Sequence, residues 1–402
     1  MRHNIYFKYY VFSLLGVIFF LFLIKLKEQI RISLLISSAS VVLSLYFVEF
    51  YLENYSNPLS LHAREAKSMG IEFDNRDKYT VYKDMLNQGL KVVPTVSPAV
   101  HLEFADNSIF PLGGISHAHT LFCNESGEYM TYKSDRFGFN NPDFVWNDYL
   151  LDFLLIGDSF TQGACVQSDE NISSVIRQFG YKSLNIGNGG NGPLSELGSL
   201  IEYSKLIKPK NILWLYYEGN DIVNLNQEKE SNLLVKYLNP KFNQDLANRQ
   251  KEIDKYLDNK IQQYHIKNEG KDYLKFIKLT KLRALLSLDE QTKDREIYDT
   301  LFIEIILKAK KISEENGGNF YFVYLPEFSR YTKMSIAQDD YLLKERMISE
   351  LEKQGVQVID IDKILFSKYR DPIEFFPFKV PGHYTKEGYQ KISQSIINVI
   401  KK

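Results

Sequence analysis

Two long apolar runs near the N-terminus constrain this chain more than any other feature. The runs Tyr9–Ile24 and Ile32–Val48 consist almost wholly of apolar and small residues. With their flanks, each approaches the ~20 residues that cross ~30 Å of hydrocarbon as a helix. Neither run has a charged face, which disfavours a helical hairpin buried in a soluble core. We therefore predict a membrane hairpin over residues 1–55, with transmembrane helices at about 6–25 and 32–52.

Charges beside these runs predict their orientation. The connector holds three basic residues against one acidic residue, and the exit from the second run carries Glu49 and Glu53. Basic residues favour the cytoplasmic side, so the connector is expected inside and both ends outside. Arg2 and Lys8 in the N-terminal tail argue for the opposite orientation.

The bulk composition excludes some classes of function. The 49 basic and 50 acidic residues leave a formal net charge of −1, which gives no electrostatic reason to expect nucleic acid. Cys123 and Cys165 are too few for a disulfide-stapled fold, and no zinc-type spacing occurs. We predict neither a metal nor a cofactor. The sequence leaves open whether the two cysteines pair.

Residues 56–150 are predicted to form a mixed connecting segment. It holds two short helical stretches, at 62–70 and 78–88, each ending at or just before a glycine. A hairpin is expected over residues 123–135, with Ser126-Gly127 at its turn.

From Asp152 onward, short apolar runs alternate with helical stretches. Runs without strong alternation are typical of strands covered on both faces, and this order predicts a doubly wound parallel sheet. The five expected strands are Phe153–Ile156, Ser183–Ile186, Ile212–Tyr217, Phe320–Leu325 and Gln357–Ile361. The expected helices cover about 168–179, 194–207, 296–316 and 386–401. The charged interval at about 225–293 is too long for a crossover, so we predict a helical insertion within a domain spanning 151–402.

The residues that follow the expected strands point to acyl-transfer chemistry. Gly157-Asp158-Ser159 follows the first strand, N-I-G-N-G-G-N-G-P the second and E-G-N-D the third, while P-G-H-Y precedes the last helix. Ligands of parallel sheets bind at the carboxyl ends of the strands. A serine, a glycine-rich loop, an asparagine and a histidine would supply nucleophile, oxyanion donors and base.

These four blocks resemble those of the SGNH (GDSL-type) hydrolases over about 152–402. The resemblance implies an SGNH/flavodoxin-like fold in which Ser159 is the nucleophile and His383 its base. It further implies an oxyanion hole made by the backbone N–H groups of Ser159 and Gly190 and the side chain of Asn220. Together with segment 123–143, the paired N-terminal runs resemble a membrane-anchored bacterial branch of this superfamily. This implies an inner-membrane protein whose catalytic domain lies outside the cytoplasm.

One position departs from the family pattern. An aspartate is usual three residues before the histidine, but Val380 stands there. A carboxylate from elsewhere could orient the imidazole, or a backbone carbonyl could do so and leave a Ser–His dyad. The candidates for the third acid are Asp360, Asp362, Asp371 and Glu374. Asp158, next to the serine, is expected to brace the turn.

Other interpretations of these residues stay open. Ser159 could be only a helix N-cap, and the glycines of the second loop superficially resemble a phosphate loop, although no G-K-[ST] occurs in the chain. Cys165 is expected to be a core residue. The insertion could dock a partner.

The sequence as a whole favours a membrane-anchored serine esterase or acyltransferase. Its partners would be the lipid bilayer and an acylated small molecule or glycan, with O-acyl esters of cell-envelope or extracellular glycans as substrate. The alternative is a catalytically inactive SGNH-like domain that binds a glycan or a partner, a reading motivated by Val380.

Overall fold

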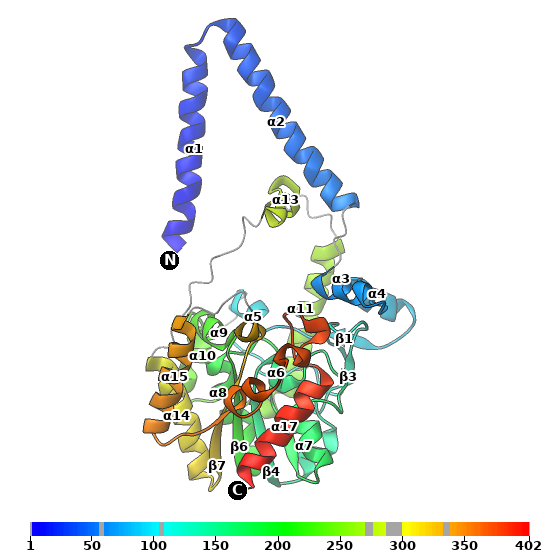
Figure 1. The fold of residues 1–402 in the computed structure, drawn as a ribbon, viewed down its shortest axis with the longest axis vertical. Helices are drawn as coiled ribbons and strands as arrows, with labels where there is room; N and C mark the ends of the chain where they lie inside the picture. Colours follow the sequence, from blue (N-terminus) through cyan, green and yellow to red (C-terminus); the bar gives the residue numbers. More distant parts are fainter. Residues whose placement is uncertain are drawn as a thin grey trace. The chain divides into compact units, whose positions relative to one another are not determined.

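The computed structural model describes residues 2–55, 60–103, 108–269, 276–286, 300–332 and 338–401. The chain forms two compact units. The N-terminal unit consists of Met1–Pro58 and Lys267–Asp294, and the sheet unit of Leu59–Ile266 and Arg295–Lys402. The chain therefore passes between the units three times, and Figure 1 shows its course in colour.

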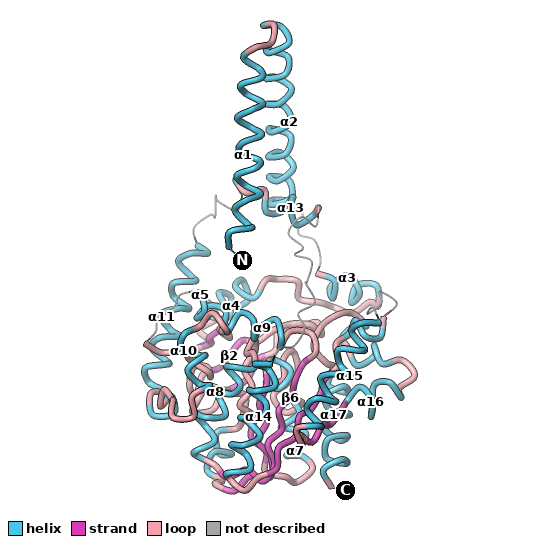
Figure 2. The backbone as a smooth tube through the Cα atoms, turned by 90° about the vertical axis from the view of Figure 1, so that its left-hand side faces the viewer, coloured by secondary structure: helices cyan, strands magenta, loops and turns pink. Residues whose placement is uncertain are grey.

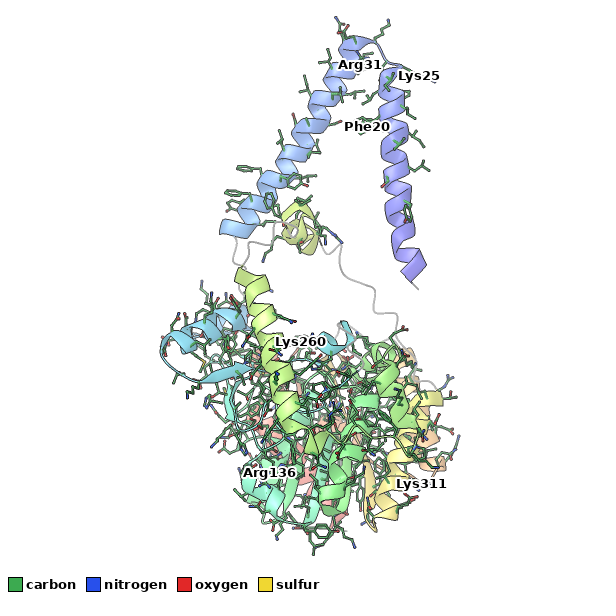
Figure 3. All side chains as sticks on the ribbon, turned by 180° about the vertical axis from the view of Figure 1, so that it is seen from behind. Phe20, Lys25, Arg31, Arg136, Lys260 and Lys311 are labelled. Carbon is green, nitrogen blue, oxygen red and sulfur yellow. A yellow bond between two sulfur atoms is a disulfide. The ribbon has the colours of Figure 1, made fainter. Side chains whose placement is uncertain are left out.

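Helices form at both predicted membrane segments of the N-terminal unit. They are α1 (Arg2–Ile24) and α2 (Glu28–Tyr55), and Figure 3 shows Lys25 and Arg31 at the turn between them. Within the described residues one stretch, Glu28–Leu52, is long and apolar enough to cross a membrane, where we expected two. The span at about 6–25 and the orientation stay predictions. A third helix, α13 (Thr280–Leu285), belongs to the same unit.

A five-stranded parallel sheet forms the centre of the sheet unit and appears in magenta in Figure 2. The strand order is β5-β4-β6-β7-β8, and every neighbouring pair is parallel. The strands are β4 (Leu150–Gly157), β5 (Ser183–Asn185), β6 (Lys208–Tyr217), β7 (Asn319–Leu325) and β8 (Gln357–Asp360). All five predicted strands and the predicted fold class of a parallel α/β sheet are confirmed.

The register of the sheet brings its functional loops to one edge. Gly157 at the end of β4 pairs with Leu215 near the end of β6. The loop that holds Ser159 and the loop that holds Asn220 therefore leave adjacent strands at the same end. Residues far apart in the sequence meet here because β4 and β6 are neighbours in a parallel sheet.

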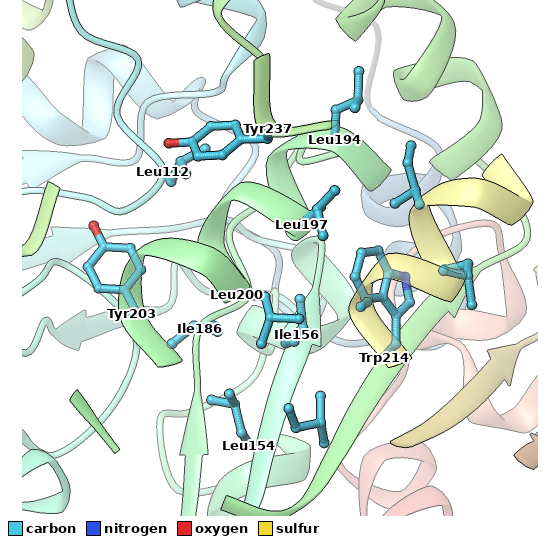
Figure 4. Close-up of a cluster of buried hydrophobic side chains, with 14 of the residues drawn as sticks. Leu112, Leu154, Ile156, Ile186, Leu194, Leu197, Leu200, Tyr203, Trp214 and Tyr237 are labelled. Atoms are coloured by element: carbon cyan, nitrogen blue, oxygen red, sulfur yellow. The ribbon is translucent and has the colours of Figure 1, made fainter. Parts of the chain in front are cut away.

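Helices cover both faces of the sheet, because side chains alternate across each strand. Leu154 and Ile156 of β4 face the core beneath α8 and α14, whereas Phe153 and Leu155 face the core beneath α7 and α17. Figure 4 shows the first core, with Trp214 among leucines of α8. The covering helices are α7 (Ile172–Gln178), α8 (Pro193–Tyr203), α14 (Thr300–Glu315), α15 (Gln338–Lys353), α16 (Ile361–Ile364) and α17 (Lys386–Ile400).

The predicted connecting segment lies, from Leu59 onward, in the same compact unit as the large sheet. It holds a small sheet of order β1-β2-β3, in which β2 and β3 form the predicted antiparallel hairpin. Ser126 and Gly127 lie in the hairpin loop, as expected, although the first strand begins earlier than predicted. The elements are α3 (Leu61–Ser68), α4 (Lys78–Asn87), β1 (Val92–Pro94), α5 (Ala99–Glu103), β2 (His119–Leu121) and β3 (Thr131–Lys133).

The interval predicted as an insertion is mostly helical where it is described, with a loop at residues 239–245. It contains α9 (Asp221–Glu228), α10 (Asn232–Val235) and α11 (Gln250–Glu269). Ile253 and Leu257 of α11 are buried in the main core, so this part is integral to the fold. Residues 267–294 instead belong to the N-terminal unit.

Candidate active site

Ser159 stands at the first position of α6 (Ser159–Gln162), and only Asp158 separates it from the end of β4. Asp158 caps this short helix, since its Oδ1 accepts a hydrogen bond of 2.8 Å from the Phe160 N–H. The turn needs glycine at position 157, where a Cβ would lie 2.1 Å from Thr161 Oγ1 and 2.7 Å from the Leu215 carbonyl oxygen. Close packing of β4 on β6 thus forces a tight turn that leaves Ser159 partly exposed. Asp158 braces the turn as predicted.

His383 meets Ser159 across 224 residues of sequence. Its Nε2 lies 2.8 Å from the Ser159 Oγ. The imidazole also packs against the ring of Phe160, with 4.6 Å between ring centroids, so the fold holds it at this position. The two residues expected to act together are therefore in direct hydrogen-bond contact.

The carboxylate beside His383 is Glu125, which lies in the loop between β2 and β3. Glu125 Oε1 lies 2.9 Å from His383 Nδ1, and Oε2 accepts a 2.6 Å hydrogen bond from the His383 backbone N–H. This network assigns the proton to Nδ1 and leaves Nε2 free to accept the Ser159 proton. Ser159, His383 and Glu125 have the connectivity of a catalytic triad.

None of the four predicted third acids is the carboxylate on His383, so that part of the prediction is wrong. Asp360 and Asp362 pair with the buried Lys344 at 2.8 and 2.7 Å. Asp371 and Glu374 pair with Lys379 at 2.7 and 3.2 Å. Each of these carboxylates is therefore engaged with a lysine and not with His383. With Val380 in the usual acid position, the imidazole takes its partner from the β2–β3 loop, 258 residues earlier in the chain.

A disulfide joins the two sides of this site. Cys123 and Cys165 are bonded, with 5.2 Å between their Cα atoms. Cys123 lies two residues before Glu125, and Cys165 lies six residues after Ser159. The bond therefore ties the loop that carries the acid to the segment that carries the serine. Cys165 is buried as expected, and the open question of pairing is answered.

Charge balance within the site favours an ionised Glu125 and a basic His383. Burial lowers the pKa of His383, but the charge of Glu125, the hydrogen bond to it and the charge of Asp158 together hold that pKa above 6.5. Burial raises the pKa of Glu125, and the charge and hydrogen bonds of His383 outweigh it, so the net shift is downward. Both shifts stabilise the ion pair that forms when His383 takes a proton.

A second histidine stands behind the acid. A Cβ at Gly382 would lie 2.7 Å from Glu125 Oε2 and 2.9 Å from His62 Nε2, so both atoms border the space that this glycine leaves. The His62 Nε2 is buried and has no hydrogen-bond partner within the described residues. Burial lowers the pKa of His62, Glu125 raises it and His383 lowers it, with a net decrease. The α3 helix thus also borders the site.

The loop that holds Gly190 lies beside the serine turn, since a Cβ at the neighbouring Gly189 would be 3.5 Å from the Ser159 Cβ. Gly190 has a φ of +86°, and a Cβ there would lie 2.9 Å from Ser97 Oγ, so the loop bends where only glycine fits easily. The N–H of Gly189 is occupied, because it donates to Gln162 Oε1 at 2.7 Å. Burial raises the pKa of Asp158, and a hydrogen bond from the Asn220 side chain is one of the effects that lower it. Asn220 therefore lies beside the turn. That Gly190 and Asn220 bind an oxyanion remains a prediction.

One group of side chains in the described part of the chain brings three possible metal-ligand atoms within 4.8 Å of one another. The group is Glu125, Cys165 and His383. Cys165 is in the disulfide, and the other two residues are hydrogen-bonded to each other. A disulfide sulfur lacks the thiolate charge that metal ligation uses, so the arrangement suits proton transfer better than metal binding.

Comparisons with known proteins give weak likenesses only. No protein-family model matches the chain, and no curated protein matches it. Among solved structures, the chain is similar to a member of the lipolytic protein G-D-S-L family from Veillonella parvula, with 12% identity, 62% of this chain and 98% of that chain covered and a TM-score of 0.35. The chain is also similar to a GDSL-like lipase from Bacteroides thetaiotaomicron. The identity is 10%, 63% of this chain and 89% of that chain are covered, and the TM-score is 0.35. For a two-domain esterase active on acetylated mannans, the identity is 9%, 64% of this chain and 51% of that chain are covered, and the TM-score is 0.34. TM-scores this low assign no family, so the function is argued from the site.

Proposed function

We propose that this protein is a membrane-anchored serine esterase or O-acyltransferase of the SGNH type. The observation that carries the proposal is the continuous chain of hydrogen-bond contacts from Ser159 through His383 to Glu125. A serine that only caps a helix needs no imidazole at 2.8 Å, and that imidazole needs no carboxylate hydrogen-bonded to its other nitrogen. The contacts together meet the geometric requirements of an activated nucleophile.

The reaction would begin when the ester carbonyl reaches the serine. The Ser159 Oγ attacks the carbonyl carbon while its proton passes to His383 Nε2, and Glu125 stabilises the resulting imidazolium. Donors at Gly190 and Asn220, with the Ser159 N–H, would stabilise the negative oxygen of the tetrahedral intermediate. His383 then gives the proton to the leaving alcohol, and the acyl group remains on Ser159.

The second half of the reaction decides between hydrolysis and transfer. His383 takes a proton from water or from a sugar hydroxyl while that oxygen attacks the acyl carbonyl carbon. The bond from this carbon to the Ser159 Oγ then breaks, and His383 returns the proton to the Ser159 Oγ. We propose O-acyl esters of cell-envelope or extracellular glycans as the substrate class. The support is the candidate span Glu28–Leu52 together with the Cys123–Cys165 disulfide, since disulfides persist mainly in oxidising compartments.

The alternative is an inactive SGNH-like binding module, and it depends on the histidine having no acid, since Val380 stands at the usual acid position. Glu125 supplies a carboxylate to the histidine, so that condition is not met. The two functions predict different outcomes in one assay, because only the esterase turns over an ester.

The test is ester turnover by the full chain in detergent. The purified protein should release p-nitrophenol from p-nitrophenyl acetate, and Ser159→Ala should lose this activity. Ser168→Ala is a matched control, because Ser168 is an exposed serine nine residues along the chain. A folded wild-type protein without turnover, or a Ser159→Ala protein with unchanged turnover, would refute the proposed mechanism.

A further inference from the structure

Within the N-terminal unit, the short helix α13 is docked on the end of α2. The Tyr46 hydroxyl donates a hydrogen bond of 3.0 Å to the Ile277 carbonyl oxygen, and the Tyr46 and Phe276 rings lie 5.6 Å apart. The Glu49 carboxylate accepts hydrogen bonds of 2.8 and 2.7 Å from the backbone N–H groups of Lys281 and Leu282. Figures 1 and 2 show α13 beside this end of α2.

Glu49 explains why the contact forms at this level of α2. It is an acidic residue inside the apolar stretch Glu28–Leu52, and only 1% of it is exposed. A carboxylate within a membrane span is unfavourable unless donors compensate its charge. The first turn of α13 supplies two N–H groups that have no acceptor within the helix itself, together with the positive end of a helix dipole. Glu49 lies three residues before the end of the candidate span, about 5 Å along the helix axis, which corresponds to the depth of the membrane interface.

The segment that includes α13, residues 276–286, has both apolar and basic residues on its surface. The apolar residues Ile277 and Leu286 are each 58% exposed. Lys278 and Lys281 are exposed in the same segment. Apolar side chains next to lysines, held beside the end of a membrane span, match the chemistry of a helix that lies in the interface of an anionic bilayer.

We propose that residues 276–286 lie in the plane of the membrane interface and bind anionic phospholipid. The inference rests on the proposed membrane anchoring by α2. The apolar side chains enter the boundary between headgroups and acyl chains, and the lysines contact phosphate groups. The chain runs from this segment to the sheet unit in both directions, and it also runs from α2 to the sheet unit, so three connections tether the sheet unit to the bilayer.

The test uses tryptophan fluorescence of the full chain in phosphatidylcholine vesicles with and without phosphatidylglycerol. Leu286→Trp places a reporter on the proposed lipid-facing segment. Val235→Trp is the matched control, because Val235 is a partly exposed apolar residue of α10 in the sheet unit. The native Trp146 and Trp214 are buried in the sheet unit and give a constant background. We expect lipids brominated near the headgroup to quench the Leu286→Trp emission and to leave the Val235→Trp emission unchanged.

The lipid chemistry is tested by neutralising the lysines. Phosphatidylglycerol should increase quenching of Leu286→Trp, and the added changes Lys278→Gln and Lys281→Gln should abolish that increase. A protein that resists carbonate extraction but shows no quenching at Leu286→Trp would overturn the inference and leave the anchor intact. Quenching independent of phosphatidylglycerol would overturn the anionic-lipid part. Release by carbonate would overturn both the anchor and the inference, and ester turnover measured on the same samples would show whether the catalytic proposal survives.

Discussion

The change Glu125→Gln tests the part of the site that lies outside the expected hydrolase blocks. The amide has nearly the shape of the carboxylate, but it has one acceptor oxygen where Glu125 uses two. If that oxygen keeps the bond to the His383 backbone N–H, the NH₂ group faces Nδ1. Nδ1 must then accept, so the ring proton moves to Nε2, which can no longer take the Ser159 proton.

The magnitude follows from this tautomer change. In a serine triad, loss of the correct tautomer lowers kcat by about 10⁴, which corresponds to about 5.5 kcal/mol of transition-state stabilisation. Glu125 is only 16% exposed, so water has little access to replace its acceptors. We therefore expect kcat to fall by about 10³ to 10⁴ and KM to change little.

The assay is steady-state turnover of p-nitrophenyl acetate from pH 5 to 9. Glu128→Gln is the matched control, because Glu128 is an exposed residue in the same hairpin loop. It should keep wild-type kcat. A Glu125→Gln variant that is folded and retains more than about a tenth of the wild-type kcat would refute the assignment of Glu125 as the orienting acid.

Three further predictions follow from the same geometry. Because the pKa of His383 lies above 6.5 and only its neutral form accepts a proton, kcat/KM should fall as the pH drops through a midpoint above 6.5, and Glu125→Gln should move that midpoint down. Asn220→Ala should lower kcat by about 10² to 10³ if the amide stabilises the oxyanion, as measured with the same ester; an unchanged kcat would remove Asn220 from the oxyanion hole. Reducing the Cys123–Cys165 bond with a phosphine should lower both kcat and the unfolding temperature, since closing a loop of 42 residues stabilises the fold by up to about 4 kcal/mol through chain entropy. A Cys123→Ala/Cys165→Ala variant should show no response to the phosphine. An unaffected wild-type kcat would show that Glu125 needs no such tether.

The sheet could be predicted from the sequence because its strands are buried on both faces. Runs such as Leu213–Trp214–Leu215 carry apolar side chains toward both layers, and such runs are recognisable without knowledge of the fold. The position of Ser159 follows from the rule that parallel strands present their ligands at one edge. His383 is predicted instead from the P-G-H-Y block that precedes the last helix. The long charged insertion was harder, because Ile253 and Leu257 are isolated apolar residues in a polar helix that nevertheless reach the main core.

The acid could not be found by local pattern, because Glu125 belongs to a small hairpin that precedes the large sheet. No periodicity links a loop at residue 125 to a turn at residue 383. One signal was present: the two cysteines lie close to Glu125 and Ser159, and pairing them would have placed the acid near the serine. The sequence leaves that pairing open, and the four predicted candidates all lie within 23 residues before His383.

Covalent trapping of the serine tests the central claim most directly. The full chain in detergent is treated with a fluorophosphonate, digested and analysed by mass spectrometry. The account predicts one phosphonyl group on Ser159 of the wild-type protein and none on Ser159→Ala. An untouched Ser159 in folded wild-type protein, or a phosphonyl group only on another residue, would contradict it.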